Sequence, residues 1–133
     1  MNAMNILDEM GLISYADFYP HELSGGLSQL VSFARAIAYH AEIMLMDEPF
    51  SALDFLTRNK LQDTVLKIHK SRCLTTIFVT HQVDEALYLA TKIIALSADK
   101  PTRTLVELDT SNVTDKNSDI FFRLQKELIG YYQ

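Results

Sequence analysis

Two adjacent carboxylates follow a short apolar segment in the middle of the chain. Residues 43–46 are all apolar, and Asp47 and Glu48 come directly after them. Such a pair at a buried strand end requires a cation or a proton, and a magnesium–nucleotide complex would supply the cation. One carboxylate could then hold the metal through water, while the next orients an attacking water. On these two residues alone, acidic capping of the next helix is the better interpretation.

Two further features also have both a chemical and a structural interpretation. Residues 75–80 form a β-branched and aromatic segment that leads into His81, whose ring could donate a hydrogen bond to a terminal phosphate. Ser24, Gly25 and Gly26 precede a helical stripe, where a hydroxyl cap and free amides form an anion site. The two glycines would let another group approach the backbone closely. Each feature alone is more often an ordinary structural element.

Helices and strands must alternate to position these residues. Helical spacing covers residues 4–10, 24–39, 55–70, 83–91 and 119–130, and strand patterns cover residues 43–46, 75–80, 93–97 and 104–108. A loop is expected around Pro20, and a hairpin through residues 99–101 would join the last two strands. The uninterrupted apolar run at residues 43–46 is typical of a strand buried on both faces. This alternation implies parallel strand pairing and an α/β layered fold, in which ligands bind beyond the carboxyl ends of the strands.

The order and spacing of these pieces resemble the ATP-binding-cassette (ABC) ATPases. The matching segments are Leu23-Ser24-Gly25-Gly26, Gln29, Ala34-Arg35-Ala36, Met46-Asp47-Glu48-Pro49, Ser51-Ala52-Leu53-Asp54 and Thr80-His81. Each segment is a weak signal alone, but the ordered set is highly specific. The resemblance implies a partial P-loop NTPase fold of the α/β class, in which parallel strands alternate with helices and a C-terminal amphipathic helix follows.

The resemblance also implies roles for single residues toward ATP and Mg²⁺. Asp47 would help to place magnesium, Glu48 would be the catalytic glutamate that polarises the attacking water, and His81 would be the switch histidine that senses the γ-phosphate. The other residues implied to bind the nucleotide are Ser24, Gly25, Gly26, Gln29 and Asp54. The signature residues 24–26 would contact the γ-phosphate held by an opposite subunit. The D-loop, residues 51–54, would cross the dimer interface.

Finer matches are typical of bacterial importer ATPases of the nitrate, sulfonate and taurine type. They lie in residues 19–23, 47–54, 80–86 and 119–130. The resemblance therefore implies a subunit that couples ATP hydrolysis to solute uptake. Its partners would be a second ATPase subunit in a head-to-tail dimer and transmembrane permease subunits. It would lie in the cytoplasm, at the inner face of the membrane through the permease, while other proteins choose the solute.

No phosphate-binding loop of the form G-x-x-x-x-G-K-[ST] occurs in the 133 residues, since no glycine precedes a lysine. That loop supplies most of the backbone donors to the β- and γ-phosphates, and its lysine adds a full charge. We therefore expect weak or no ATP binding and no hydrolysis by this chain alone. Ser28 and Leu30 also stand where the family commonly has basic residues.

Three segments describe the expected organisation. Residues 1–22 would be the remnant of a helical subdomain, residues 23–109 the C-terminal part of the nucleotide-binding domain, and residues 110–133 a linker and the C-terminal helix. An incomplete or frameshifted product is expected rather than a purpose-built half-domain. Because the neighbouring strands would be missing, exposed sheet edges should leave the chain marginally stable or dependent on association.

The amino-acid composition argues against several other classes of protein. A formal net charge of −5 provides no basic field for nucleic acid, and no apolar stretch approaches the roughly 20 residues that cross a bilayer. The single cysteine, Cys73, excludes an internal disulfide and fits a reducing compartment. ABC proteins of DNA repair normally carry a long coiled coil, and no heptad run is present. A non-catalytic regulatory or interaction module derived from an ABC ATPase remains the alternative.

Overall fold

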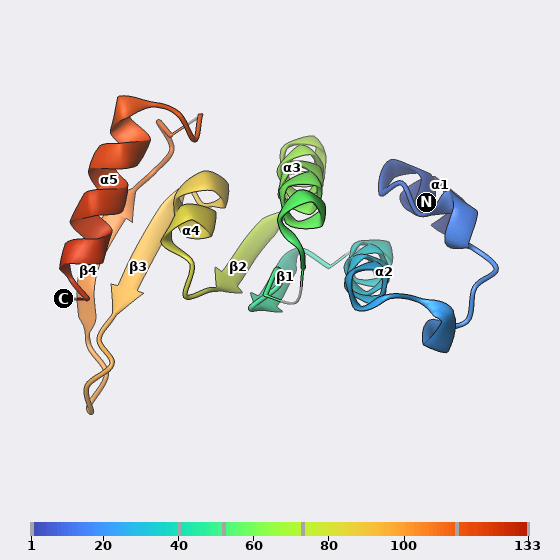
Figure 1. Cartoon of the computed structure of the whole chain (residues 1–133), viewed down its shortest axis with the longest axis horizontal. Coiled ribbons are helices and arrows are strands. Elements are labelled where there is room, and N and C mark those ends of the chain that lie inside the picture. The colour runs from blue at the N-terminus through green and yellow to red at the C-terminus, as the bar shows by residue number, and fades with distance from the viewer. Residues whose placement is uncertain (1, 40, 52, 73, 114, 133) are drawn as a thin grey trace. The chain divides into compact units, whose positions relative to one another are not determined.

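The computed structural model describes residues 2–39, 41–51, 53–72, 74–113 and 115–132. It divides the chain into two compact units, unit 1 (Met1–Val79) and unit 2 (Thr80–Gln133) (Figure 1). This division differs from the three expected segments, whose boundaries remain a prediction. Ala52 of the expected D-loop and Cys73 lie outside the described residues.

Unit 1 contains three α-helices, two 3₁₀ turns and two strands in its described part. In chain order they are α1 (Ala3–Glu9), η1 (Ile13–Tyr15), η2 (Pro20–Glu22), α2 (Gly25–Ala38), β1 (Ile43–Asp47), α3 (Phe55–Arg72) and β2 (Thr75–Val79). Gly11 lies just beyond α1 with φ of +68°, a left-handed conformation that favours glycine. The loop expected around Pro20 is instead the turn η2, where the Glu22 carboxylate accepts a hydrogen bond from the Tyr19 amide.

The strands β1 and β2 pair in parallel, as their apolar character predicts. Leu45 lies opposite Ile77 in the register, and Asp47 lies opposite Val79. The expectation that β1 is buried on both faces is wrong for this structure. Met44 is buried, whereas the neighbouring Leu45 remains 74% exposed. Because side chains alternate between the two faces of a strand, one face of this two-stranded sheet packs and the other faces solvent.

The packed part of unit 1 joins side chains from the helices, β1 and the segment that follows β1. The buried apolar residues are Ile6, Met10, Leu12, Phe33, Ala34, Ile37, Met44, Phe50, Leu53, Leu61, Val65 and Ile68. The predicted helical face with Leu61, Val65 and Ile68 is confirmed in α3. An ion pair of 2.6 Å between Arg72 and Glu9 ties the end of α3 to α1.

Unit 2 is a β-hairpin packed against helices. Its elements are α4 (Val83–Leu89), β3 (Lys92–Leu96), β4 (Thr104–Asp109) and α5 (Asp119–Gly130). Strand β3 pairs with β4 in antiparallel fashion, so the predicted hairpin is confirmed and parallel pairing holds only for β1 with β2. Helix α5 lies along this hairpin (Figure 1) and shares a core with it and with α4. That core consists of Leu87, Ile93, Ala95, Phe121 and Leu128. Among the described residues, no helix is both long and apolar enough to cross a membrane.

Candidate functional site

Asp47 and Glu48 lie where the sequence predicts them, at the carboxyl end of β1. Asp47 is the last residue of the strand, and the Glu48 amide donates a hydrogen bond of 2.9 Å to the carbonyl of Val79 at the end of β2. Glu48 has φ of +46°, the only positive value for a non-glycine residue among those described. This conformation is unfavourable for a residue with a side chain, and such strain is concentrated at functional sites.

The turn after Glu48 is held from several sides. The Glu48 carbonyl accepts hydrogen bonds from the Ser51 amide at 3.2 Å and from the Ser51 hydroxyl at 3.0 Å. The Pro49 carbonyl accepts a hydrogen bond from the side-chain amide of Gln29 in α2. Phe50 anchors the same turn, because its side chain is 0% exposed. Backbone and side-chain contacts together therefore determine where Glu48 emerges from the sheet.

Ser24 caps α2, as predicted. Its hydroxyl accepts a hydrogen bond of 3.3 Å from the Leu27 amide. A side-chain carbon added at Gly25 would meet no atom within 4 Å, so the first turn of α2 is open to an approaching group there. Such a carbon at Gly26 would lie 3.1 Å from the Leu53 side chain. Packing within unit 1 therefore explains Gly26, while Gly25 leaves the helix N-terminus accessible to an anion.

Asp54 precedes α3 and satisfies its first amides. One carboxylate oxygen accepts hydrogen bonds from the Leu56 amide at 3.0 Å and the Thr57 amide at 3.1 Å. The hydrogen bond from the Thr57 side chain, with those from the amides, lowers the pKa of Asp54 below its ordinary value of 3.8. Asp54 therefore starts the helix that follows the D-loop, in addition to any contact with a nucleotide.

This lowered pKa predicts how acid affects unit 1. The ionised Asp54 stabilises the folded state above its ordinary pKa of 3.8, and the stabilisation is lost as the pH falls further, through the lower pKa of the folded state. Asn also caps helices well but does not titrate. We therefore expect Asp54→Asn to lose less stability than the native chain when the pH falls below about 3.8, measured by urea unfolding at several pH values. Parallel pH profiles for the two proteins would contradict this.

His81 belongs to unit 2 and is exposed there. One of its ring nitrogens lies 3.0 Å from the Gln82 side-chain amide. The preceding Thr80 hydroxyl donates a hydrogen bond of 2.8 Å to the buried carboxylate of Glu85 and accepts one of 3.0 Å from the Gln82 amide. These contacts fix the start of α4 and leave the imidazole at the surface of the unit, directly after the end of β2.

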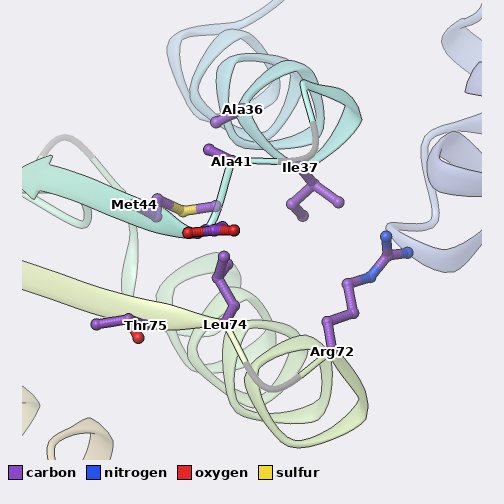
Figure 2. Close-up of a pocket in the computed structure, with 8 residues that line it drawn as sticks. Ala36, Ile37, Ala41, Met44, Arg72, Leu74 and Thr75 are labelled. Atoms are coloured by element: carbon purple, nitrogen blue, oxygen red, sulfur yellow. The ribbon is translucent and has the colours of Figure 1, made fainter.

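A cavity lies at the other end of the strands, among the residues that the structure describes. Its volume is about 600 Å³. Figure 2 shows Ile37 from α2 and Leu74, which directly precedes β2, pointing into it. It is lined by Ala36, Ile37, Ala41, Glu42, Met44, Arg72, Leu74 and Thr75. The predicted site residues are not among them, and Arg72 is already paired with Glu9. The cavity is therefore separate from the site at the carboxyl end of β1.

The side chains that could bind Mg²⁺ are few. In the described part of the chain, no group of three or more His, Cys, Asp or Glu side chains could hold a metal by itself. Mg²⁺ needs only one or two protein carboxylates when phosphates and water supply its other ligands. Asp47 at the end of β1 meets that requirement. The residues present thus fit a magnesium ion carried by a nucleotide.

Sequence patterns did not reveal three features of this site. They are the positive φ of Glu48, the contact from Gln29 to Pro49 and the packing of Gly26 on Leu53. The adjacent carboxylates pointed to the strand end, but no residue spacing indicated which side chain of α2 reaches the following turn.

The chain is similar to known proteins of one family. A family model described as ABC transporter matches residues 1–51. An uncharacterized ABC transporter ATP-binding protein of Methanocaldococcus jannaschii is 43% identical over 130 residues, which cover 96% of this chain and 48% of that protein. An aliphatic sulfonates import ATP-binding protein of Bacillus cereus is 41% identical over 117 residues, which cover 86% of this chain and 46% of that protein.

A solved structure shows the same fold. It is the dimeric structure of a bacterial ABC transporter cassette, with a TM-score of 0.68 and 31% sequence identity. The match covers 81% of this chain and 45% of that one. The chain therefore spans about half the length of the relatives that it matches.

Proposed function

Because the chain belongs to the ABC transporter ATPase family, as a partial segment of the cassette, we propose that it is the signature-to-switch portion of an importer's ATPase subunit. The observation that carries this proposal is the turn at the end of β1. There Asp47 ends the strand, and a strained, multiply restrained backbone presents Glu48. A carboxylate held in this way can orient a water molecule toward a phosphate.

We assign the residues of the site as follows. Asp47 holds magnesium, and Glu48 orients the attacking water. His81 contacts the γ-phosphate. Bound Mg²⁺ would neutralise the charge that develops on the phosphates. Signature residues 24–26 serve a nucleotide held by a second ATPase subunit. The open approach at Gly25 and the helix N-terminus beside it support this last role.

The partners and location follow from the same proposal. A head-to-tail dimer places each signature segment opposite the other subunit's nucleotide, and permease subunits hold the pair at the inner face of the membrane. The Bacillus cereus relative is a sulfonate importer subunit by name. We therefore propose a small organic or inorganic oxyanion as the solute class, with the solute chosen by partner proteins.

A chimera tests the function. This chain replaces the matching 46% of the Bacillus cereus relative, and the remainder of that protein supplies a complete cassette. We expect the purified chimera to hydrolyse ATP in the presence of Mg²⁺ and to restore sulfonate uptake with the relative's own permease. A folded chimera that binds ATP and forms the dimer without turnover would favour the non-catalytic module instead.

The 133-residue chain alone should behave differently. Because its sequence contains no phosphate-binding loop, we expect no ATP turnover above background and no ATP binding at millimolar nucleotide. A steady-state ATPase assay together with isothermal calorimetry measures both, with the chimera as the positive control. Turnover by the chain that disappears in Glu48→Gln would overturn this expectation.

A further inference from the structure

The turn that carries Glu48 accepts a hydrogen bond from a side chain of another element. We propose that Gln29 is a positioning residue for Glu48, acting through the hydrogen bond from its side-chain amide to the Pro49 carbonyl. This inference rests on the proposed function, since it concerns the orientation of the water-polarising carboxylate. It differs from the direct nucleotide contact that the family resemblance implies for Gln29.

The backbone at Glu48 is strained. Glu48 has φ of +46°, a region that side chains disfavour because of contact with the backbone. A residue keeps such a conformation only when surrounding contacts over-determine it. If those contacts weaken, the backbone relaxes and the direction of the carboxylate changes with it. The contacts around Glu48 are therefore part of what aims its side chain.

The contacts that restrain the turn come from different parts of the chain. The Val79 carbonyl in β2 accepts from the Glu48 amide, and Ser51 donates to the Glu48 carbonyl from within the same turn. Gln29 comes from α2, 20 residues earlier in the chain. Substituting Gln29 removes this hydrogen bond without changing the sequence of the turn or the pairing of β1 with β2. Its removal therefore isolates the effect of α2 on the turn.

Packing holds α2 close to the segment that follows β1. Gly26, one helical turn before Gln29, lies so close to Leu53 that an added carbon would be 3.1 Å from it. Gln29 itself is half-buried and Pro49 is buried. A buried carbonyl needs a hydrogen-bond donor, because water cannot replace a lost partner there. The amide of Gln29 meets this need.

Hydrogen exchange on the full 133-residue chain tests the contact without relying on catalysis. Gln29→Met keeps much of the side-chain volume and removes the donor. We expect the Glu48 and Ser51 amides to exchange about tenfold faster, a change typical of one lost hydrogen bond, while the Val65 amide in α3 keeps its rate. Ser32→Ala is the matched control, because it removes a side-chain hydrogen bond within α2 itself, and it should leave the Glu48 rate unchanged.

Two exchange results would overturn the proposal. One is an unchanged rate at Glu48 in Gln29→Met, and the other is an equal increase at Glu48 and Val65, which reports general destabilisation. If Gln29→Met does not fold, Gln29→Glu answers the same question, because it keeps the side-chain length and replaces the amide donor by a carboxylate.

Kinetics of the chimera then separate positioning from nucleotide binding. We expect Gln29→Met to lower kcat about tenfold with KM for ATP within about twofold of the parent, because orientation of the water affects the chemical step. A higher KM with unchanged kcat would assign Gln29 to the nucleotide instead. If the chimera with native Gln29 lacks activity, the proposed function fails, and the exchange experiment still decides the contact.

Discussion

Replacing Glu48 by glutamine in the chimera is expected to lower kcat for ATP hydrolysis by about 10²- to 10⁴-fold, the usual contribution of a positioned general base. The amide has nearly the same shape as the carboxylate but cannot accept a proton from water. Glu48 occupies its strained turn through backbone contacts, so the substitution should not disturb the fold. Nucleotide binding by the chimera should therefore persist while turnover is lost.

The matched control for this variant is Glu127→Gln. Glu127 is exposed on α5, so the same chemical change there should leave kcat within about twofold, as expected for surface substitutions. ATP affinity measured by calorimetry and phosphate release measured in steady state distinguish the possible results. Retained turnover in Glu48→Gln would remove Glu48 from the catalytic role, and equal loss of binding and turnover would assign it to the nucleotide site.

Phe50→Ala should have the largest effect on stability. The phenyl ring is 0% exposed, and truncating a fully buried phenylalanine typically lowers the free energy of unfolding by about 3–5 kcal/mol. Small domains are stable by only about 5–15 kcal/mol in total. We therefore expect the urea midpoint of the 133-residue chain, followed by far-UV circular dichroism, to fall sharply or the variant to be unfolded without denaturant.

Phe55→Ala provides the same truncation five residues later. Phe55 is 73% exposed, so its removal should change the free energy of unfolding by no more than about 0.5 kcal/mol. Equal midpoints for the two variants would show that Phe50 does not anchor the turn after Glu48. Unchanged stability in Phe50→Ala would also remove the reason to expect that the site and the core of unit 1 depend on each other.

Periodicity predicted the elements well because it reflects backbone geometry. The helix expected at residues 24–39 is α2, Gly25–Ala38, and the hairpin expected near residue 100 joins β3 and β4. Burial was predicted less well. An apolar run such as residues 43–46 indicates a strand that can be covered on both faces, but it does not state what covers it, and Leu45 is exposed here.

The site was also predictable only in part. The position of Asp47 and Glu48 at the end of a strand was predictable, because an apolar run directly precedes them. The strain at Glu48 and the contact between Gln29 and Pro49 were not, because they arise when side chains far apart in the sequence pack together. Residue spacing contains no direct signal for such packing. The assigned roles toward nucleotide and metal therefore remain predictions, and Glu48→Gln tests the role of Glu48 among them.

The solvent-facing side of the parallel sheet also affects how stability changes with temperature. Ile43, Leu45, Ile77 and Val79 are all exposed in the folded chain, so unfolding exposes less new apolar surface at these residues than at buried ones. The heat capacity of unfolding follows the apolar surface newly exposed to water, about 12–15 cal/mol/K per residue in ordinary proteins. We therefore expect the value per residue for this chain to fall below that range. A smaller heat capacity of unfolding should flatten the dependence of stability on temperature, and covering the exposed face of the sheet should raise the maximum stability and strengthen the curvature.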